Sequence, residues 1–343
     1  MKPSRYEEAG VSIDAQDQAI DRIKAHVNTT NTSRVLSGIG SFGGLFDISF
    51  PEMEAPVLVS STDGVGTKLK VAFDAERYDT VGQCLVNHCI DDILVQGAKP
   101  LFFMDYVATG RLKPNVVEEI VKGMAIASRE NQMSVLGGEM AEMPGFYQDG
   151  EFDIAGFIVG VVDRPKILGA DRVKQGQQII GLPSTGLHTN GYSLARKIIF
   201  EEQNIGMNDL IPGSDMTAAD ALLAIHRSYY PMLHEFLEEN LIQAMAHITG
   251  GGFLDNIPRV LPKDLDAVLR LDSYELPPLF KFLVEHGKMD GEEPYRVFNM
   301  GIGMTLVVNQ DDLEKVMSKL ASSGEKAYHI GEIVAGNGKV QLK

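Results

Sequence analysis

NHCIDDILVQGAKPLFFMDYVATG, residues 87–110, is the stretch of sequence that decides the fold. Its first part belongs to a segment from Thr80 to Gln96 in which apolar residues recur at helical spacing, namely Val86, Cys89, Ile90 and Ile93. Its second part, Leu101 to Ala108, is a short and largely apolar run of the kind found in buried strands. A helix that leads into a buried strand is typical of α/β proteins.

The same alternation continues on both sides of this stretch. Strand-like runs lie at Pro56 to Ser60, Met133 to Gly137 and Phe152 to Asp163. Pro114 opens a second helix-like segment between them, because proline suits the first turn of a helix. We therefore predict an α/β fold (mixed α+β) with mixed sheets and flanking helices.

The chain is long enough for two domains. At 343 residues it exceeds the usual size of one compact core. The segment from Asp163 to Gln178 is polar and lacks a sustained period, which predicts domains of residues 1–168 and 169–343. In the second half we expect strands at QIIGL, AMAHI, MTLVV and AYHIGEI, and helices at Tyr192 to Glu202, Ala218 to Glu239 and Phe253 to Val260.

Composition excludes several classes of protein. A formal charge of -16 argues against nucleic-acid partners, although a small phosphorylated substrate can still be held by local groups. The N-terminus has no apolar signal region and no apolar run is long enough to span a bilayer, so we expect a cytoplasmic protein with no membrane partner. The two cysteines, Cys84 and Cys89, flank His88, and two reduced core thiols are favoured over a disulfide or a zinc site.

A glycine-rich loop follows the first predicted strand. It reads STDGVGTK, Ser61 to Lys68, and it offers Asp63 to a cation, Lys68 to a phosphate, and two glycines, Gly64 and Gly66, that let the backbone approach an anion. It is no Walker A loop, because Thr67 precedes the lysine instead of following it. A tight turn without function is an equal alternative for this segment alone.

Two acidic segments suggest a metal site. Asp91 and Asp92 are adjacent in an otherwise apolar helix, where a carboxylate is costly to bury without a cation, and we favour Asp92 as a ligand of Mg2+. Further along, Glu139 and Glu142 follow the strand that ends at Gly138, and they share one face if the chain turns helical there. A solvated helix start is the alternative.

Three more glycine-rich segments complete the candidates. GLHTNGYS contains His188 and Asn190, and HITGGGF contains His247, Gly250 and Gly251; each precedes a predicted helix, where an anion can bind. A GxGxxG pattern lies at Gly38, Gly40 and Gly43, but neither a strand before it nor a helix after it is predicted. This context favours a flexible loop over a dinucleotide site.

In this order, these segments resemble the signature stretches of the phosphoribosylformylglycinamidine cyclo-ligase (aminoimidazole ribonucleotide synthetase) family. The resemblance runs from Tyr6 to Met304 and also includes YEEAGVSIDA, DIAGFIVGVV and FNMGIGM. It implies a homodimer of two-domain subunits, formed through the N-terminal domains. It also implies an ATP- and Mg2+-dependent closure of the imidazole ring in purine biosynthesis, through phosphorylation of the formyl oxygen of formylglycinamidine ribonucleotide.

The resemblance also implies roles for individual residues. Asp63, Asp92 and Glu139 are expected to form one acidic metal cluster, and Lys68 to contact the nucleotide phosphates with its loop, which includes Gly64, Gly66 and Thr67. The loop with Gly38, Gly40, Gly43 and Gly44 is expected to close over the nucleotide. The residues expected on the substrate side are His188, Asn190 and His247, together with Gly250 and Gly251.

Three positions depart from the family pattern, and two other functions stay open. Asp91 stands where the family usually has Asn, Met140 stands where it usually has Thr, and NTTNTS after Val27 lacks the usual basic residues. One alternative is another ATP-dependent enzyme of the superfamily, such as a thiamine monophosphate kinase. The other is an ATP-binding scaffold without catalysis, which the retained Asp63, Lys68, Asp92 and Glu139 disfavour.

Overall fold

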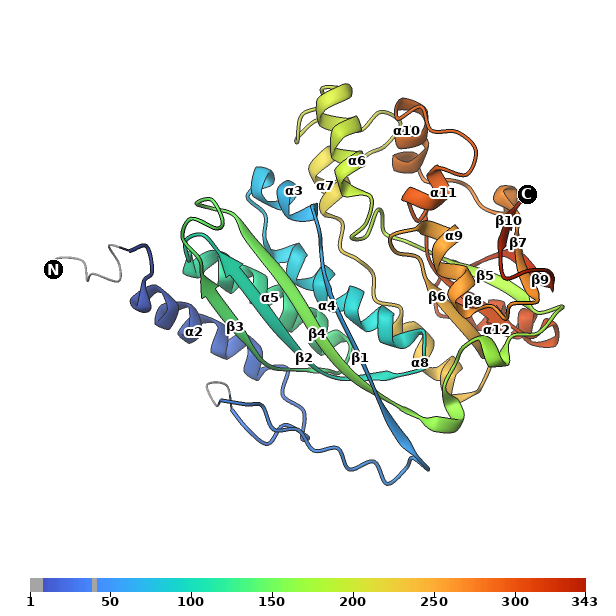
Figure 1. Cartoon of the computed structure of the whole chain (residues 1–343), viewed down its shortest axis with the longest axis horizontal. Helices are drawn as coiled ribbons and strands as arrows, with labels where there is room; N and C mark the ends of the chain where they lie inside the picture. Colours follow the sequence, from blue (N-terminus) through green and yellow to red (C-terminus); the bar gives the residue numbers. More distant parts are fainter. Residues whose placement is uncertain (1–8, 39–41) are drawn as a thin grey trace.

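The computed structural model describes residues 9–38 and 42–343 and contains two separate β-sheets (Figure 1). The sheets are built from residues 56–163 and 178–342, so the connection between them runs over residues 164–177. Two mixed sheets with flanking helices confirm the predicted fold class. The domain limits at residues 168 and 169 stay a prediction.

The first sheet has four strands in the order β1 (Pro56–Gly64), β4 (Phe152–Asp163), β2 (Lys99–Thr109) and β3 (Ser134–Glu142). β4 is antiparallel to both of its neighbours, whereas β2 and β3 are parallel. The parallel pair needs a crossover, which α5 (Pro114–Glu130) provides.

Helices cover one face of the first sheet. α4 (Asp79–Leu94) packs against the strands and against α5, while α2 (Ile13–Asn28) packs against α5, and α3 (Lys68–Ala75) precedes α4 (Figure 1). Thirteen of the sixteen residues of α4 are buried, which is why its sequence is apolar on more than one side. Cys84 and Cys89 are free, buried thiols on this helix, as predicted.

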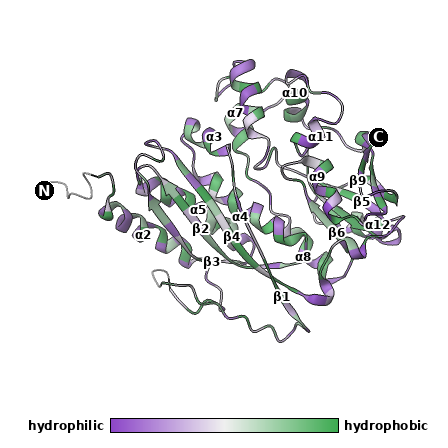
Figure 2. Cartoon of the chain, viewed as in Figure 1, coloured by the Kyte–Doolittle hydropathy of each residue, from purple (hydrophilic) through white to green (hydrophobic). Residues whose placement is uncertain are grey.

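The second sheet has six strands, antiparallel except for the pair at one edge. Its order is β10 (Val340–Leu342), β7 (Leu265–Leu269), β9 (Tyr328–Ala335), β5 (Gln178–Pro183), β8 (Ile302–Val308) and β6 (Ile242–His247). Alternate residues of its strands enter two different core clusters, so both faces are buried. The strands are accordingly hydrophobic along most of their length (Figure 2).

The remaining helices of the second half are short. α8 (Tyr230–Glu238) and α12 (Leu313–Ser322) belong to one core cluster of the sheet, and α9 (Gly252–Asn256) belongs to the other. The other helices are α6 (Tyr192–Arg196), continued by a π-helical turn, α7 (Ala218–Leu223), α10 (Pro278–His286) and α11 (Pro294–Val297). Within the described part of the chain, we find no helix that is both long and apolar enough to cross a membrane.

Three local predictions were wrong. β1 does not end at Ser60 but continues to Gly64, and it therefore includes Asp63. β3 continues through Glu139 to Glu142 instead of turning helical, and side chains three apart in a strand point to opposite faces. The single helix expected from Ala218 to Glu239 is two helices, α7 and α8, because residues 224–229 form an extended connection.

Candidate active site

Asp63 and Asp92 meet at one end of the first sheet through His88. Asp63 lies near the end of β1, and its Oδ2 is 2.8 Å from His88 Nε2 on α4. Asp92 lies one helical turn after His88, so both face the same way, and its Oδ2 is 3.7 Å from the same nitrogen. The histidine is almost fully buried, whereas the side chains of Asp63 and Asp92 keep 45% and 23% of their surface exposed.

The second sheet contributes His247 to this pair. His247 is the last residue of β6, and its Nδ1 lies 2.9 Å from Asp92 Oδ1. The hydroxyl of Ser61, on β1, donates to Asp92 Oδ2 at 3.2 Å. Residues from both halves of the chain therefore fix the Asp92 carboxylate.

The charges of these groups follow from their contacts. Burial opposes the ionisation of Asp92, but the hydrogen bond from His247 and the nearby imidazoles outweigh it and lower the pKa of Asp92. In the same way, burial opposes a charged Asp63, yet its hydrogen bond with His88 leaves the pKa of Asp63 lowered. Burial also opposes a charged His88, but Asp63 and Asp92 raise its pKa overall. Two ionised carboxylates thus flank one imidazole.

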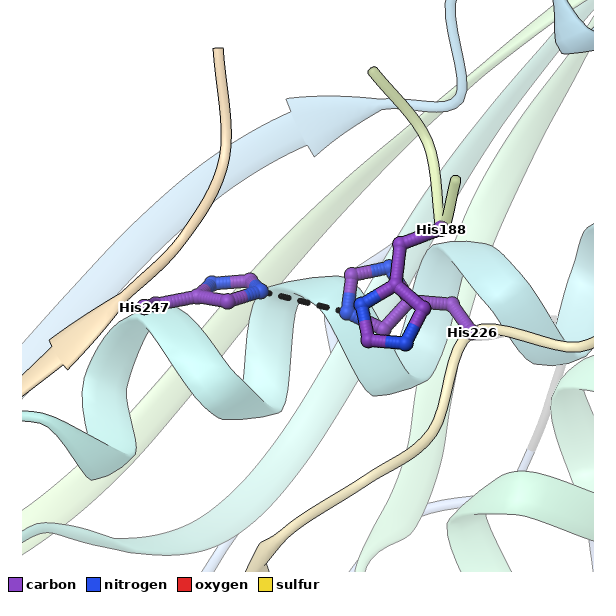
Figure 3. Close-up of side chains that lie close together, drawn as sticks. All are labelled: His188, His226 and His247. Atoms are coloured by element: carbon purple, nitrogen blue, oxygen red, sulfur yellow. Dashed lines mark hydrogen bonds between the residues drawn. The ribbon is translucent and has the colours of Figure 1, made fainter. Parts of the chain in front are cut away.

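Behind this pair lies a cluster of histidines, shown in Figure 3. His226 Nε2 is 3.1 Å from His247 Nε2, and the ring of His188 stacks on that of His226 with centroids 3.9 Å apart. Burial, followed by the charges of neighbouring side chains, lowers the pKa of His188 and of His226 well below the ordinary value. Both rings are therefore neutral at pH 7.

The oxygen ligands of this site suit Mg2+. Magnesium prefers carboxylate oxygens and usually takes one or two of them together with substrate phosphates. Asp63 and Asp92 are ionised, partly exposed and held on either side of His88, so they meet this requirement. His88, Asp92 and His247 also come close enough together to hold an ion, although their nitrogen atoms suit softer metals.

Asp92 and His247 also line a cleft of about 460 Å3. Arg259 lies on its wall, together with the polar side chains of Ser60, Ser61, Thr249 and Asn256. The Asn256 amide donates to the backbone oxygens of Gly250 and Gly252, which shapes the loop at the start of α9. The cleft therefore combines a candidate metal ligand, Asp92, with the positively charged side chain of Arg259 and several hydrogen-bonding groups.

Glu139 does not lie with Asp63 and Asp92, although one acidic cluster was expected. It pairs with Tyr106 of β2, which pairs with Ala155 of β4, which pairs with Gly64 of β1. Three strand spacings separate Glu139 from β1, or about 14 Å. The strand order places β3, and with it Glu139, at the edge of the sheet opposite β1.

Glu139 instead lines a second pocket, of about 230 Å3, with the glycine-rich loop. Gly38, Gly43 and Gly44 belong to its wall, whereas Gly40 lies outside the described residues. The apolar part of the wall comes from α2, α5 and β3, namely Ile20, Ile23, Val27, Val121, Val135 and Leu136. Asp105 of β2 also lines this pocket, and burial raises its pKa to about 7.

Lys68 does not face the site, contrary to the expected phosphate contact. Its side chain is fully buried, and its Nζ donates to the backbone oxygens of His188, at 3.0 Å, and Ala224, at 2.6 Å. The ammonium group therefore binds two backbone carbonyl oxygens instead of a nucleotide phosphate. The lysine thus joins the start of α3 to two connections of the second half.

The histidines expected on the substrate side are engaged inside the protein. His188 is 2% exposed, and its Nε2 accepts the backbone N–H of Thr185. His247 borders the cleft, but its two ring nitrogens face Asp92 and His226. In this structure, His247 therefore contacts Asp92 and fixes the position of its carboxylate.

The other expected binding residues come from loops of both halves. Asn190 lies beside Gly250, whose missing side chain would be 3.1 Å from its Oδ1, and Thr67 Oγ1 lies 3.0 Å from Ser193 Oγ. Gly66 and Gly251 have φ of +55° and +93°, a region that favours glycine. Gly64 ends β1 next to Asp63.

Sequence reasoning missed three residues of these sites. His88 could have been found, because it precedes Asp92 by four residues on a helix and so shares its face. His226 and Asp105 gave no such signal. His226 lies in a stretch without a motif, and Asp105 lies inside an apolar strand.

The fold and the site define a class of two-domain α/β proteins with a carboxylate site between the halves. The chain has the fold of thiamine-monophosphate kinase from Stenotrophomonas maltophilia (TM-score 0.67, 17% identity, 95% and 96% of the two chains covered). It also has the fold of the hydrogenase maturation protein HypE, solved in complex with ATP (TM-score 0.67, 16% identity, 94% and 90% covered). At these identities the likeness concerns the fold alone.

Sequence comparison narrows the class to one family. Residues 49–162 match the N-terminal domain of AIR synthase related proteins, and residues 174–343 match the C-terminal domain. The chain is 49% identical over 340 residues to the phosphoribosylformylglycinamidine cyclo-ligase of Geobacter metallireducens, with 98% of each chain covered. It is 48% identical over 337 residues to that of a Thermoanaerobacter species, with 98% and 99% covered. The chain belongs to the phosphoribosylformylglycinamidine cyclo-ligase family.

Proposed function

We propose that this protein closes the imidazole ring of 5-aminoimidazole ribonucleotide from formylglycinamidine ribonucleotide, with conversion of ATP to ADP and phosphate. The observation that carries this proposal is the pair of ionised carboxylates, Asp63 and Asp92, of which Asp92 lines a cleft together with His247 of the second half. The family relation supports the same reaction. The proposed setting is purine biosynthesis in the cytoplasm.

The reaction has two parts that the site can serve. An amide oxygen is a poor leaving group, so the formyl oxygen first takes the γ-phosphoryl group of ATP. A nitrogen of the same substrate then attacks the activated carbon and phosphate leaves, in a step that benefits from being intramolecular. The closure releases one proton and breaks the carbon–oxygen bond to the phosphoryl group.

Each carboxylate has a stated task in this proposal. Asp63 and Asp92 would hold Mg2+, which supplies charge neutralisation for the phosphate groups when it is bound. The buried ring of His88 lies against both carboxylates and holds them in place. The Ser61 hydroxyl fixes one oxygen of Asp92. Arg259, on the wall of the same cleft, is suited to the phosphate of the ribonucleotide.

The pocket beside β3 is suited to the purine base of ATP. Its apolar wall can cover the faces of a flat ring, and Gly43 and Gly44 let the loop approach closely. Asp105, which lines this pocket, pairs with Gly156 on β4, and Gly156 pairs with Asp63 on β1. The pocket therefore lies two strands from the carboxylate site. Two strand spacings amount to about 10 Å, a separation that a nucleotide can bridge.

We also propose that the enzyme is a homodimer formed through the first sheet. The helices cover one face of this sheet, while the side chains of Leu58, Met104 and Phe157 expose 57%, 40% and 47% of their surface. Met104 and Phe157 are directly paired on neighbouring strands. A group of exposed apolar residues on three strands is typical of a surface that a partner covers.

One assay tests the reaction directly. The pure protein is incubated with ATP, Mg2+ and formylglycinamidine ribonucleotide, and the products are identified by mass spectrometry. We expect the imidazole ribonucleotide together with ADP. Release of ADP only with thiamine monophosphate would favour the kinase alternative, and nucleotide binding without any turnover would favour the scaffold.

A further inference from the structure

Residues 224–229, between α7 and α8, are bound to the helices of the first half. The amide of Asn87 donates to the backbone oxygen of His226 at 2.7 Å, and Asp91 Oδ1 accepts the backbone N–H of Tyr229 at 2.9 Å. Lys68 Nζ donates to the oxygen of Ala224. The connection therefore has a fixed position against α3 and α4, and it carries His226, which is fully buried, into the histidine cluster (Figure 3).

Hydrogen-bond partners assign the protons along this cluster. An ionised Asp92 can only accept, so His247 Nδ1 carries the proton that faces it at 2.9 Å. A neutral His247 then has a lone pair on Nε2. His226 Nε2, 3.1 Å away, must therefore carry a proton and donate it.

One further contact agrees with this assignment. Asp91 Oδ2 also lies 3.4 Å from His226 Nε2, but burial raises the pKa of Asp91 well above its usual range and no hydrogen bond joins the two, so this contact does not bear on the position of the proton. On the other side, His226 Nδ1 lies 3.4 Å from the hydroxyl of Thr189, which can donate to it. The same hydroxyl lies 2.5 Å from His88 Nδ1.

These contacts form a continuous chain from one carboxylate to the other. It runs from Asp63 through His88 and Thr189 to His226, and from there through His247 to Asp92. His226 is the member that reaches His247 from behind, on the side away from Asp92. Without the proton on His226 Nε2, Nε2 of the buried His247 ring would lack a hydrogen-bond partner, and only the contact with Asp92 would orient the ring.

We propose that His226 is a positioning residue of the active site, which donates a hydrogen bond to His247 and thereby holds the Asp92 carboxylate in the orientation that a metal ion requires. This inference rests on the proposed function, in which Asp92 binds Mg2+. Groups that orient the ligands of a metal commonly contribute about 10- to 100-fold to its affinity. Loss of the His226 donor should weaken metal binding by that factor.

A matched pair of variants separates the donor from the ring. His226→Phe keeps an aromatic ring for stacking on His188 but has no donor. His226→Gln offers an amide N–H at a similar distance from the backbone. Both are compared with the wild type in thermal unfolding and circular dichroism, and binding is measured by electron paramagnetic resonance with Mn2+ as the probe, in the presence of ADP.

We expect Mn2+ to bind about 10- to 100-fold more weakly to His226→Phe, and His226→Gln to recover most of the affinity. In 15N-histidine-labelled protein without metal, the Nε2 resonance of His247 should move in His226→Phe and return toward its wild-type position in His226→Gln. Equal Mn2+ affinity in the wild type and His226→Phe, or an unmoved Nε2 resonance of His247, would overturn the role of His226 but leave the proposed function intact. A wild type that binds no Mn2+ with ADP would contradict the proposed function as well.

If His226→Phe does not fold, His226→Gln decides the question together with Thr189→Val. Thr189→Val leaves the His226 donor in place but removes the hydroxyl behind it. We then expect a smaller loss of Mn2+ affinity for Thr189→Val and a nearly intact affinity for His226→Gln. An affinity that falls equally in both would show that packing, and not the hydrogen bond to His247, sets the metal site.

Discussion

At the scale of single residues, Asp92 belongs to the proposed metal site, whereas Lys68 belongs to the contact between the halves. Asp92 takes hydrogen bonds from Ser61 and His247 and remains partly exposed, so it is prepared for a ligand. Lys68, in contrast, is not available to a ligand, because its ammonium group is buried and donates to backbone oxygens. Both are charged residues, and it is their contacts that assign Asp92 to ligand binding and Lys68 to the contact between the halves.

Asp92→Asn tests the first role. The amide keeps the size of the side chain but removes the charge that a metal ion needs, so we expect Mg2+-dependent turnover to fall by at least about 100-fold. The fold should stay intact, as judged by circular dichroism and thermal unfolding. Turnover like that of the wild type would show that Asp92 is not a metal ligand.

Lys68→Met tests the second role. The change removes the ammonium donor from two buried carbonyl oxygens and leaves that of His188 with only the Tyr192 hydroxyl, 3.1 Å away. We expect the free energy of unfolding to fall by about 2–4 kcal/mol. Urea denaturation measures this loss, and isothermal titration with ADP measures nucleotide binding by the folded variant. If Lys68 contacts phosphate instead, the result will be weak ADP binding with unchanged stability.

At the scale of elements, a close contact between two helices positions the site. α4 carries His88, Asp91 and Asp92, and it approaches α5 at Gly82 and Gly123. A side chain at Gly82 would overlap the backbone oxygen of Ile120, and one at Gly123 would overlap that of Asp79. Glycine is required at both positions because the two backbones almost touch.

Gly82→Ala should therefore separate the helices. Although alanine favours a helix more than glycine does, the overlap with α5 should dominate, and we expect a loss of about 1–3 kcal/mol in unfolding free energy. Lys122→Ala, at an exposed position on α5, serves as the control and should stay within about 0.5 kcal/mol of the wild type. A Gly82→Ala protein as stable as the control would contradict the close contact.

At the scale of the whole molecule, the proposed dimer depends on the outer face of the first sheet. Phe157→Asp places a charge among exposed apolar residues, and we expect it to convert the proposed dimer to a monomer in analytical ultracentrifugation. The matched control is Leu210→Asp, at a position that is also exposed, by 59%, but in the second half. A wild type that sediments as a monomer would exclude the proposed dimer.

The buried histidines also make the stability of the molecule depend on pH. The pKa values of His188 and His226 are well below the ordinary value of 6.5, so the unfolded chain binds more protons than the folded one below that pH. The contribution of these two histidines to stability should fall as the pH drops below 6.5, by up to about 1.4 kcal/mol per pH unit for each of them. His88 acts in the opposite direction, because its pKa is raised and its contribution is lost as the pH rises.

Urea denaturation between pH 7.5 and pH 5.5 checks this balance. Burial also raises the pKa of Asp91 and of Asp105, and these carboxyl groups act in the same direction as His88, so the comparison between variants isolates the contribution of one histidine. His226→Gln removes one of the titrating rings and should show a shallower decline. A decline in His226→Gln as steep as that of the wild type would contradict a neutral, buried His226.

The sequence by itself determined the fold class, the strands at the start of each unit and the glycine-rich and acidic segments. Helical spacing from Val86 to Ile93 and the apolar run from Leu101 to Ala108 depend only on local pattern, so they could be predicted. The carboxylates Asp63 and Asp92 could also be named, because each follows or interrupts an apolar element.

Only the tertiary structure decided which of these residues meet. It separated Glu139 from Asp63 by three strands and buried Lys68 against backbone oxygens. It also brought His226 to His247 across the connection between α7 and α8. These outcomes depend on strand order and on packing between distant segments, and local periodicity contains no information about either.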